Sequence, residues 1–218
     1  MQHLPDTVPA LLTEIWVLAP TLITAAVVGR AYFGSVIFHP RWTPLWATAR
    51  KILVPLLDTL LRRRLGSAAP SVTNRALESE VVGLVDHSPK QLATALDTCR
   101  DVEVPLLAGY KTDWEGRSES GTLVWYYGPE PFPSAPNWLR PFQVHLTTFT
   151  VHTESGVRQL VTAHREANPY RPDLWADHLR KGSHHSVEDG VRRVERALQD
   201  ADITFDTDHP AIMASGDA

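Results

Sequence analysis

The chain has 218 residues, an apolar share of 43% and a net charge of −4, which suits one ordinary domain plus an appendage. Seven Trp, six Phe and five Tyr exclude a globally disordered chain. The small net charge provides no overall field that would attract nucleic acid. A single cysteine, Cys99, excludes an internal disulfide framework and a cysteine-rich zinc module.

The first expected element is a membrane-spanning helix over 10–29. This segment contains one ionisable residue, Glu14, and at about 1.5 Å per residue it covers roughly 30 Å, the thickness of a bilayer's hydrocarbon core. Pro20 lies in its middle, and membrane helices tolerate proline better than soluble helices do. A buried core helix is the alternative interpretation.

Basic residues follow this apolar segment and do not precede it. No Lys or Arg occurs before Arg30, and seven lie between Arg30 and Arg64 against one acid, Asp58. The positive-inside rule therefore predicts a single-pass protein with residues 1–9 outside. The C-terminal domain is then expected in the cytoplasm, or in the virion interior if the chain is viral.

Residues 30–65 are predicted to form a basic, interfacial helical segment, in which Leu, Ile and Val alternate with Arg and Lys. Its aromatic side chains suit a headgroup layer, and its terminal arginines can contact anionic lipid at about 1 kcal/mol per charge. We expect Pro55 to kink or end the helix. Two alternatives are a helix packed on the domain and a second membrane pass. The predicted lipid-facing or interfacial residues are Trp42, Trp46, Arg62, Arg63 and Arg64.

The soluble part of the chain is expected to be an α+β domain. Residues 66–74 (GSAAPSVTN) are small and polar and form the predicted linker. The domain covers 75–204 and is followed by a disordered acidic tail, 205–218. The expected elements are strands over 80–85, 106–114 and 122–127, a hairpin of 143–153 with 157–165, a helix capped by Ser88, and helices over 172–181 and 187–199. This order predicts an antiparallel sheet with helices on one face.

The hairpin carries the first candidate site. If Ser155-Gly156 is its two-residue turn, Thr147 faces His164 and His145 faces Glu166. Two imidazoles beside a carboxylate can hold a metal or share acid–base chemistry. His145-Leu146-Thr147 also resembles one half of the motif of the two-histidine phosphoesterases, whose second half is missing here. The alternative is that these histidines bond to their neighbours on a sheet face.

Several short motifs resemble a family of uncharacterised proteins from halophilic archaea and their viruses. They are AGYK (108–111), VWYYGP (124–129), QVHLTTF (143–149), AHREAN (163–168), DHLR (177–180) and VEDGV (187–191). The resemblance covers residues from about 80 to 198. It implies an α+β fold, a salt-adapted context and, through the viral members, a virion or membrane role, but no activity. This chain is less acidic than such proteins usually are.

Two further groups of residues, one of His and Asp and one of basic side chains, are more typical of an ordinary protein surface than of a functional site. A metal site is conceivable from Asp177, His178, His184 and His185, with His164 as a further ligand, but the spacing matches no standard zinc arrangement. The basic residues near the C-terminus are interleaved with acids, as on a solvated helix face with internal ion pairs. They are Arg180, Lys181, Arg192, Arg193 and Arg196. The chain has no P-loop, no GxSxG motif and no dinucleotide fingerprint.

These patterns together predict a membrane-anchored structural or interaction protein. Its expected partners are the membrane and a protein of unknown identity or a second copy of the chain, with no nucleic acid. No cofactor and no metal are expected. The alternative is a small phosphoester hydrolase that uses His145 and His164, with Thr147 and Glu166 beside them.

Overall fold

The computed structural model describes residues 43–66, 73–105, 110–174, 177–178 and 182–208. The predicted membrane helix over 10–29 and Trp42 lie outside the described residues, as does the side chain of Trp46. Within the described ranges, no helix has the length and apolar character needed to cross a membrane.

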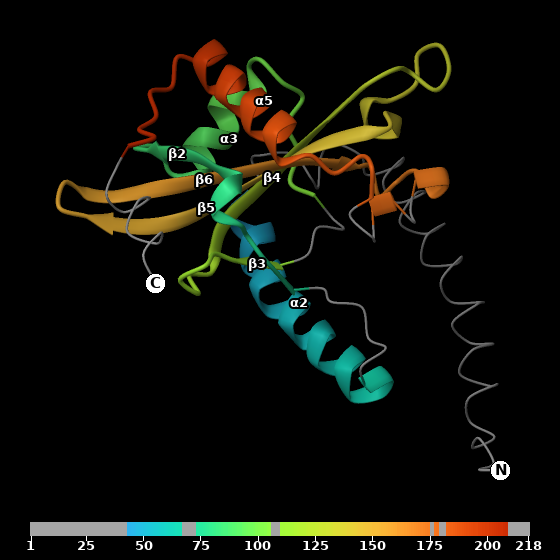
Figure 1. The fold of residues 1–218 in the computed structure, drawn as a ribbon, viewed down its shortest axis with the longest axis horizontal. Helices are drawn as coiled ribbons and strands as arrows, with labels where there is room; N and C mark the ends of the chain where they lie inside the picture. The colour runs from blue at the N-terminus through green and yellow to red at the C-terminus, as the bar shows by residue number, and fades with distance from the viewer. Residues whose placement is uncertain (1–42, 67–72, 106–109, 175–176, 179–181, 209–218) are drawn as a thin grey trace. The chain divides into compact units, whose positions relative to one another are not determined.

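The main sheet has four antiparallel strands in the order β2-β6-β5-β4 (Figure 1). These strands are β2 (Val81–Val85), β4 (Glu119–Tyr127), β5 (Phe142–Thr153) and β6 (Gly156–Ala167). Two short strands, β1 (Thr73–Arg75) and β3 (Tyr110–Thr112), form a separate parallel pair. The described helices are α2 (Thr43–Leu65), α3 (Pro89–Asp97) and α5 (Val187–Asp200), with 3-10 turns η3 (Glu78–Glu80), η4 (Asn137–Leu139) and η5 (Pro172–Leu174). The predicted α+β class with an antiparallel sheet is confirmed.

Serine caps begin both helices that cover the sheet. The Ser88 hydroxyl accepts a hydrogen bond from the Gln91 backbone, and the Gln91 side chain accepts one from the Ser88 backbone at 2.9 Å. This reciprocal capping box, with Pro89 in the first turn, was predicted from the sequence. Ser186 caps α5 by accepting from the Asp189 backbone at 3.2 Å.

One face of the main sheet is apolar and is covered by α3 and α5, as Figure 1 shows. Its buried side chains include Leu92 and Leu96 from α3, Val194 and Leu198 from α5, and Leu123, Val144, Leu146, Val161 and Ala163 from the sheet. Because side chains alternate along a strand, the neighbours of these sheet residues point to the opposite face. The polar residues of the candidate site lie there.

The register of the β5–β6 hairpin differs from the prediction. Thr153 pairs with Gly156, so the two-residue turn is Glu154-Ser155 and Gly156 is the first residue of β6, with φ +130°. The predicted turn began one residue later. That shift moves every cross-strand pair by two positions, and His145 therefore pairs with His164 instead of Glu166.

Other boundaries also differ from the sequence prediction. The linker assigned to 66–74 is shorter, because Thr73 and Asn74 already belong to β1. Phe205 and Asp206, which we assigned to the disordered tail, are ordered, since Phe205 packs against the core and Asp206 bonds to the Leu84 backbone. Helix α2 continues through Pro55 and does not end there.

Gly190 sets how closely α5 approaches the sheet. A Cβ atom at this position would clash with the backbone of His164 and Arg165 on β6. Backbone atoms cannot move away by changing rotamer, so only glycine permits the contact. The helix thereby lies directly behind the strand that carries His164.

We predict that Gly190→Ala destabilises the protein by about 3 kcal/mol, because α5 must lift from β6 to admit the methyl group. Urea unfolding followed by circular dichroism measures the change. Gln199→Ala, at an exposed position of the same helix, is the control and should have little effect. Equal stability of the two variants would contradict the close packing of α5 on β6.

Candidate functional site

The sheet face opposite α3 and α5 carries a buried group of ionisable side chains. His145 on β5 and His164 on β6 are direct cross-strand partners, each 4% exposed, with ring centroids 5.2 Å apart. Glu166 lies two residues beyond His164, on the same face of β6. The structure therefore brings together three of the four residues that the sequence singled out, in a register that the sequence did not predict.

Glu166 is the centre of this group because each of its oxygens faces a different imidazole. Its Oε1 lies 3.3 Å from His145 Nδ1, and its Oε2 lies 3.5 Å from His164 Nε2. The Gln143 amide donates to Oε1 at 2.6 Å. His178 Nδ1 approaches Oε2 to 3.6 Å while contacting the Ala167 carbonyl at 2.8 Å.

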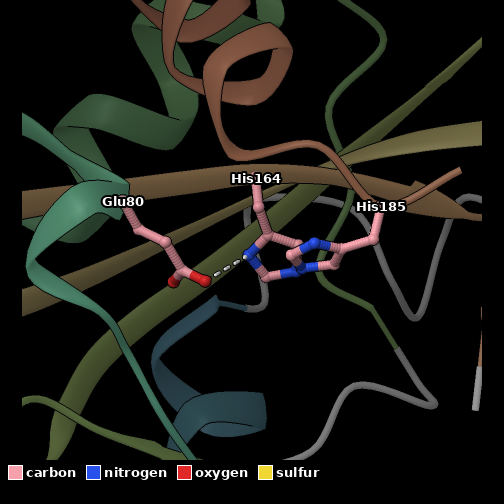
Figure 2. Close-up of side chains that lie close together, drawn as sticks. All are labelled: Glu80, His164 and His185. Atoms are coloured by element: carbon pink, nitrogen blue, oxygen red, sulfur yellow. Dashed lines mark ion pairs between the residues drawn. The ribbon is translucent and has the colours of Figure 1, made fainter. Parts of the chain in front are cut away.

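A second carboxylate, Glu80 at the end of η3, lies on the far side of His164. Its Oε1 is 3.4 Å from His164 Nδ1, and Figure 2 shows the carboxylate pointing at that ring, with His185 stacked beside it. Lys111 on β3 brings an ammonium group to the same place, 3.2 Å from His164 Nδ1 and 3.8 Å from Glu80 Oε2. Glu80 and Lys111 are 1% and 5% exposed.

The distances define one set of tautomers that satisfies both rings. The Lys111 ammonium can only donate, so His164 Nδ1 accepts and His164 Nε2–H donates to Glu166. His145 Nδ1–H donates to the other oxygen of Glu166, and His145 Nε2 accepts from the Thr122 hydroxyl at 2.8 Å. An unbroken series of polar contacts thus runs from Lys111 through His164, Glu166 and His145 to Thr122.

The surroundings shift the pKa of two members of this series. Burial, reinforced by the nearby charge of Lys111, lowers the pKa of His145 to about 3. Burial alone would raise the pKa of Glu166, but hydrogen bonds from His145 and His164 hold it well below its usual value. His145 is therefore neutral and Glu166 is ionised across the physiological range.

Burying two carboxylates and an ammonium is costly, and an apolar core of equal volume would often be as stable or more so. Buried ionisable groups that perturb one another are also frequent at functional sites. The outer edge of the cluster remains accessible, because the side chains of Glu166 and His178 are 14% and 19% exposed. These features mark the cluster as a candidate site that is approached from the side of Glu166.

The other residues predicted for chemistry do not join the cluster as a group. Thr147 is fully buried and pairs with Thr162, and within the described ranges its hydroxyl has no hydrogen-bond partner. Asp177 bonds to His184 at 2.6 Å, and neither residue belongs to a metal-ligand group found among the described residues. The four residues Asp177, His178, His184 and His185 therefore do not converge on one point.

Arg192 and Arg193 in the middle of α5 form ion pairs within the helix, as expected. Asp189 accepts hydrogen bonds from Arg192 at 2.9 Å and Arg193 at 3.0 Å. Arg193 also lies over the Tyr127 ring, 3.9 Å from its centroid. This agrees with the predicted intrahelical ion pairs.

The sequence patterns do not indicate four residues that contact the cluster, namely Glu80, Lys111, Thr122 and Gln143. The alternation along 122–127 and 143–149 could have placed Thr122 and Gln143 on the histidine face once the register was known. Glu80 and Lys111 come from short elements distant in sequence, and no local pattern marks them.

No family model, no curated protein and no solved structure matches the chain.

We predict that protein stability falls as the pH is lowered from 6.5 to about 5, because His145 gains a proton on unfolding that it does not bind when folded. The pKa of His145 in the folded protein, about 3, lies below its ordinary value of 6.5. The contribution of His145 to the free energy of unfolding is therefore fully present above pH 6.5 and is lost as the pH falls towards 3. The expected slope is about 1 kcal/mol per pH unit. This pH range lies above 4.5, the ordinary pKa of a glutamate, so protonation of Glu166 does not contribute to the slope.

Urea unfolding at stepped pH measures this dependence, and His145→Gln should flatten it. His152→Gln, at an exposed histidine of the same strand, is the control and should leave the slope unchanged. A slope that survives in His145→Gln would contradict the assignment to this residue.

We also predict that Glu80 and Lys111 are coupled. Lys111→Met should destabilise the protein by about 3–5 kcal/mol, because the Glu80 carboxylate stays buried without the lysine charge. Glu80→Gln combined with Lys111→Met should cost less than the sum of the single substitutions, by about 1–3 kcal/mol. Urea unfolding of the four proteins completes the cycle, and strict additivity would argue against the pair.

Proposed function

We propose that this protein works at a membrane surface, with α2 lying in the headgroup region of an anionic leaflet and the α+β domain held beside it. The observation that carries the proposal is the outward apolar side of α2. The orientation favoured by the charges places the domain on the cytoplasmic side, or inside a virion.

Five large apolar side chains of α2 are between 48% and 60% exposed. They are Ile52, Leu53, Leu56, Leu57 and Leu60. At about 100° per residue these positions fill one side of the helix. Val54, Asp58 and Leu61 on the other side are half-buried. A helix of a water-soluble domain normally has the reverse pattern, so this apolar side needs an apolar environment.

Positive charge adjoins the apolar side. The last turn of α2 contains Arg62, Arg63 and Arg64, and none of the first-turn residues is acidic. Arg62 pairs with Asp58, while Arg63 and Arg64 fall on the same side as the exposed leucines. An apolar side bordered by arginines suits the boundary between acyl chains and anionic headgroups.

A phosphoester hydrolase is the second candidate, favoured by the direct pairing of His145 with His164. Acid–base catalysis needs a group that reaches the substrate, and each of these imidazoles is only 4% exposed. Contacts with Glu166 and Thr122 also occupy the two ring nitrogens of His145, and contacts with Glu166 and Lys111 occupy those of His164. The membrane proposal is therefore the better supported of the two.

The test places an environment-sensitive NBD fluorophore on the full chain, at Leu56→Cys in a Cys99→Ala background. We expect NBD emission to shift to the blue in phosphatidylserine vesicles and to be quenched by nitroxide-labelled lipid. Because the probe reports on α2 itself, the result does not depend on whether residues 10–29 cross the bilayer.

Val157→Cys provides the matched control, since Val157 on β6 is 58% exposed, like Leu56 at 56%. Its probe should show neither shift nor quenching. A blue shift at Leu56 without quenching by lipid would mean that protein covers α2, and no shift would mean that it stays in water. Either result would overturn the proposal.

A further inference from the structure

We propose that His145 Nδ1, His164 Nε2 and the Glu166 carboxylate form a binding site for one divalent transition-metal ion, of which Zn²⁺ is the natural probe. The site is independent of the membrane proposal. It departs from our sequence-based expectation that the chain binds no metal.

The spacing of the ligand atoms fits such an ion. Zn²⁺ binds histidine and carboxylate ligands at about 2.0–2.2 Å in tetrahedral geometry, which places the ligands about 3.4 Å from one another. Each oxygen of the Glu166 carboxylate lies near one imidazole, with Oε1 3.3 Å from His145 Nδ1 and Oε2 3.5 Å from His164 Nε2. All three ligand atoms fall within 4.8 Å of one another.

The scaffold holds these ligands rigidly. His145 and His164 are cross-strand partners inside the longest hairpin of the described residues, and α5 packs directly behind His164 through Gly190.

In a metal-binding histidine, the ring nitrogen that does not bind the metal usually donates a hydrogen bond to a nearby acceptor. Both histidines of this site have such an acceptor. With metal on His145 Nδ1, the proton moves to Nε2 and is donated to the Thr122 hydroxyl at 2.8 Å, which in turn donates to the Leu146 carbonyl at 3.3 Å. With metal on His164 Nε2, Nδ1–H faces Glu80 Oε1 at 3.4 Å (Figure 2). Lys111, now beside a protonated Nδ1, is expected to turn towards Glu80.

A rival site uses Glu80, His164 and His185, which also lie within reach of a common ion. It requires His164 Nδ1, the atom that the Lys111 ammonium approaches to 3.2 Å. The positive charge of Lys111 therefore opposes a cation there. The His164 and His185 rings are also stacked, with 28° between their planes (Figure 2), so their edges do not converge as in a three-ligand site.

The ion would have one side open for a further ligand. Glu166 forms the partly exposed edge of the site, and His178 stands beside its Oε2 at 3.6 Å. Three protein ligands with an open position are the arrangement of catalytic zinc sites, whereas structural sites are closed by four. A metal ion held by these three ligands would therefore act as a Lewis acid at the edge of an otherwise packed sheet face.

The experiment titrates the full chain, purified in mild detergent and stripped with a chelator, with Zn²⁺ by calorimetry, and with Co²⁺ by visible absorption. We expect one ion per chain with a Kd at or below about 1 μM and the strong absorption of tetrahedral Co²⁺. His145→Gln and, as an isosteric second variant, Glu166→Gln should each weaken Zn²⁺ binding by at least about 100-fold.

His185→Gln separates the two sites, because it removes a ligand of the rival set alone and should change the Kd by less than about threefold. His152→Gln controls for the loss of any histidine. Circular dichroism establishes that each variant is folded. The proposal is overturned if the folded wild-type chain does not bind Zn²⁺, if binding survives in both His145→Gln and Glu166→Gln, or if His185→Gln alone abolishes it.

Discussion

The carboxylate of Glu166 is the group on which the polar face of the sheet depends. Its two oxygens each take a hydrogen bond from a different imidazole, and its charge is the reason why two adjacent buried histidines can both direct an N–H inward. Without that charge, the two rings would face each other across the strands with no shared acceptor. The tautomers of His145 and His164, and through them the positions of Thr122 and Lys111, follow from this single group.

The two faces of the sheet are consequently built on different principles. On one face, α3 and α5 bury aliphatic side chains in the usual way, and the absence of a side chain at Gly190 lets α5 rest on the backbone of β6. On the other face, stability requires that every buried charge has a partner, with Lys111 between His164 and Glu80. Packing on the apolar face fixes the positions of the strands. Because the strands are fixed, the side chains of His145, His164 and Glu166 on the polar face are held in place.

The sequence was sufficient for the local features and insufficient for the site. The helix cap at Ser88, the strand alternation and the hairpin are short-range signals, and Ser88 begins its helix as predicted. The pairing of His145 with His164 was missed because it depends on whether the turn begins at Glu154 or at Ser155, a choice that propagates along the hairpin. Glu80 and Lys111 reach the site from η3 and β3, and only tertiary structure brings them beside His164. In α2, by contrast, a clear local signal was misleading, because the helix continues through Pro55 although proline usually breaks a helix.

The central claim is that Glu166 organises the two imidazoles of His145 and His164, whose tautomers exchange when a metal binds. Nitrogen-15 NMR of the histidine side chains, recorded near pH 7 with and without Zn²⁺, tests it most directly. We predict that the metal-free protein carries the proton of His145 on Nδ1 and that of His164 on Nε2, and that saturating Zn²⁺ moves both protons to the opposite nitrogens. A cationic His145 without metal, or tautomers unchanged by Zn²⁺, would contradict the claim.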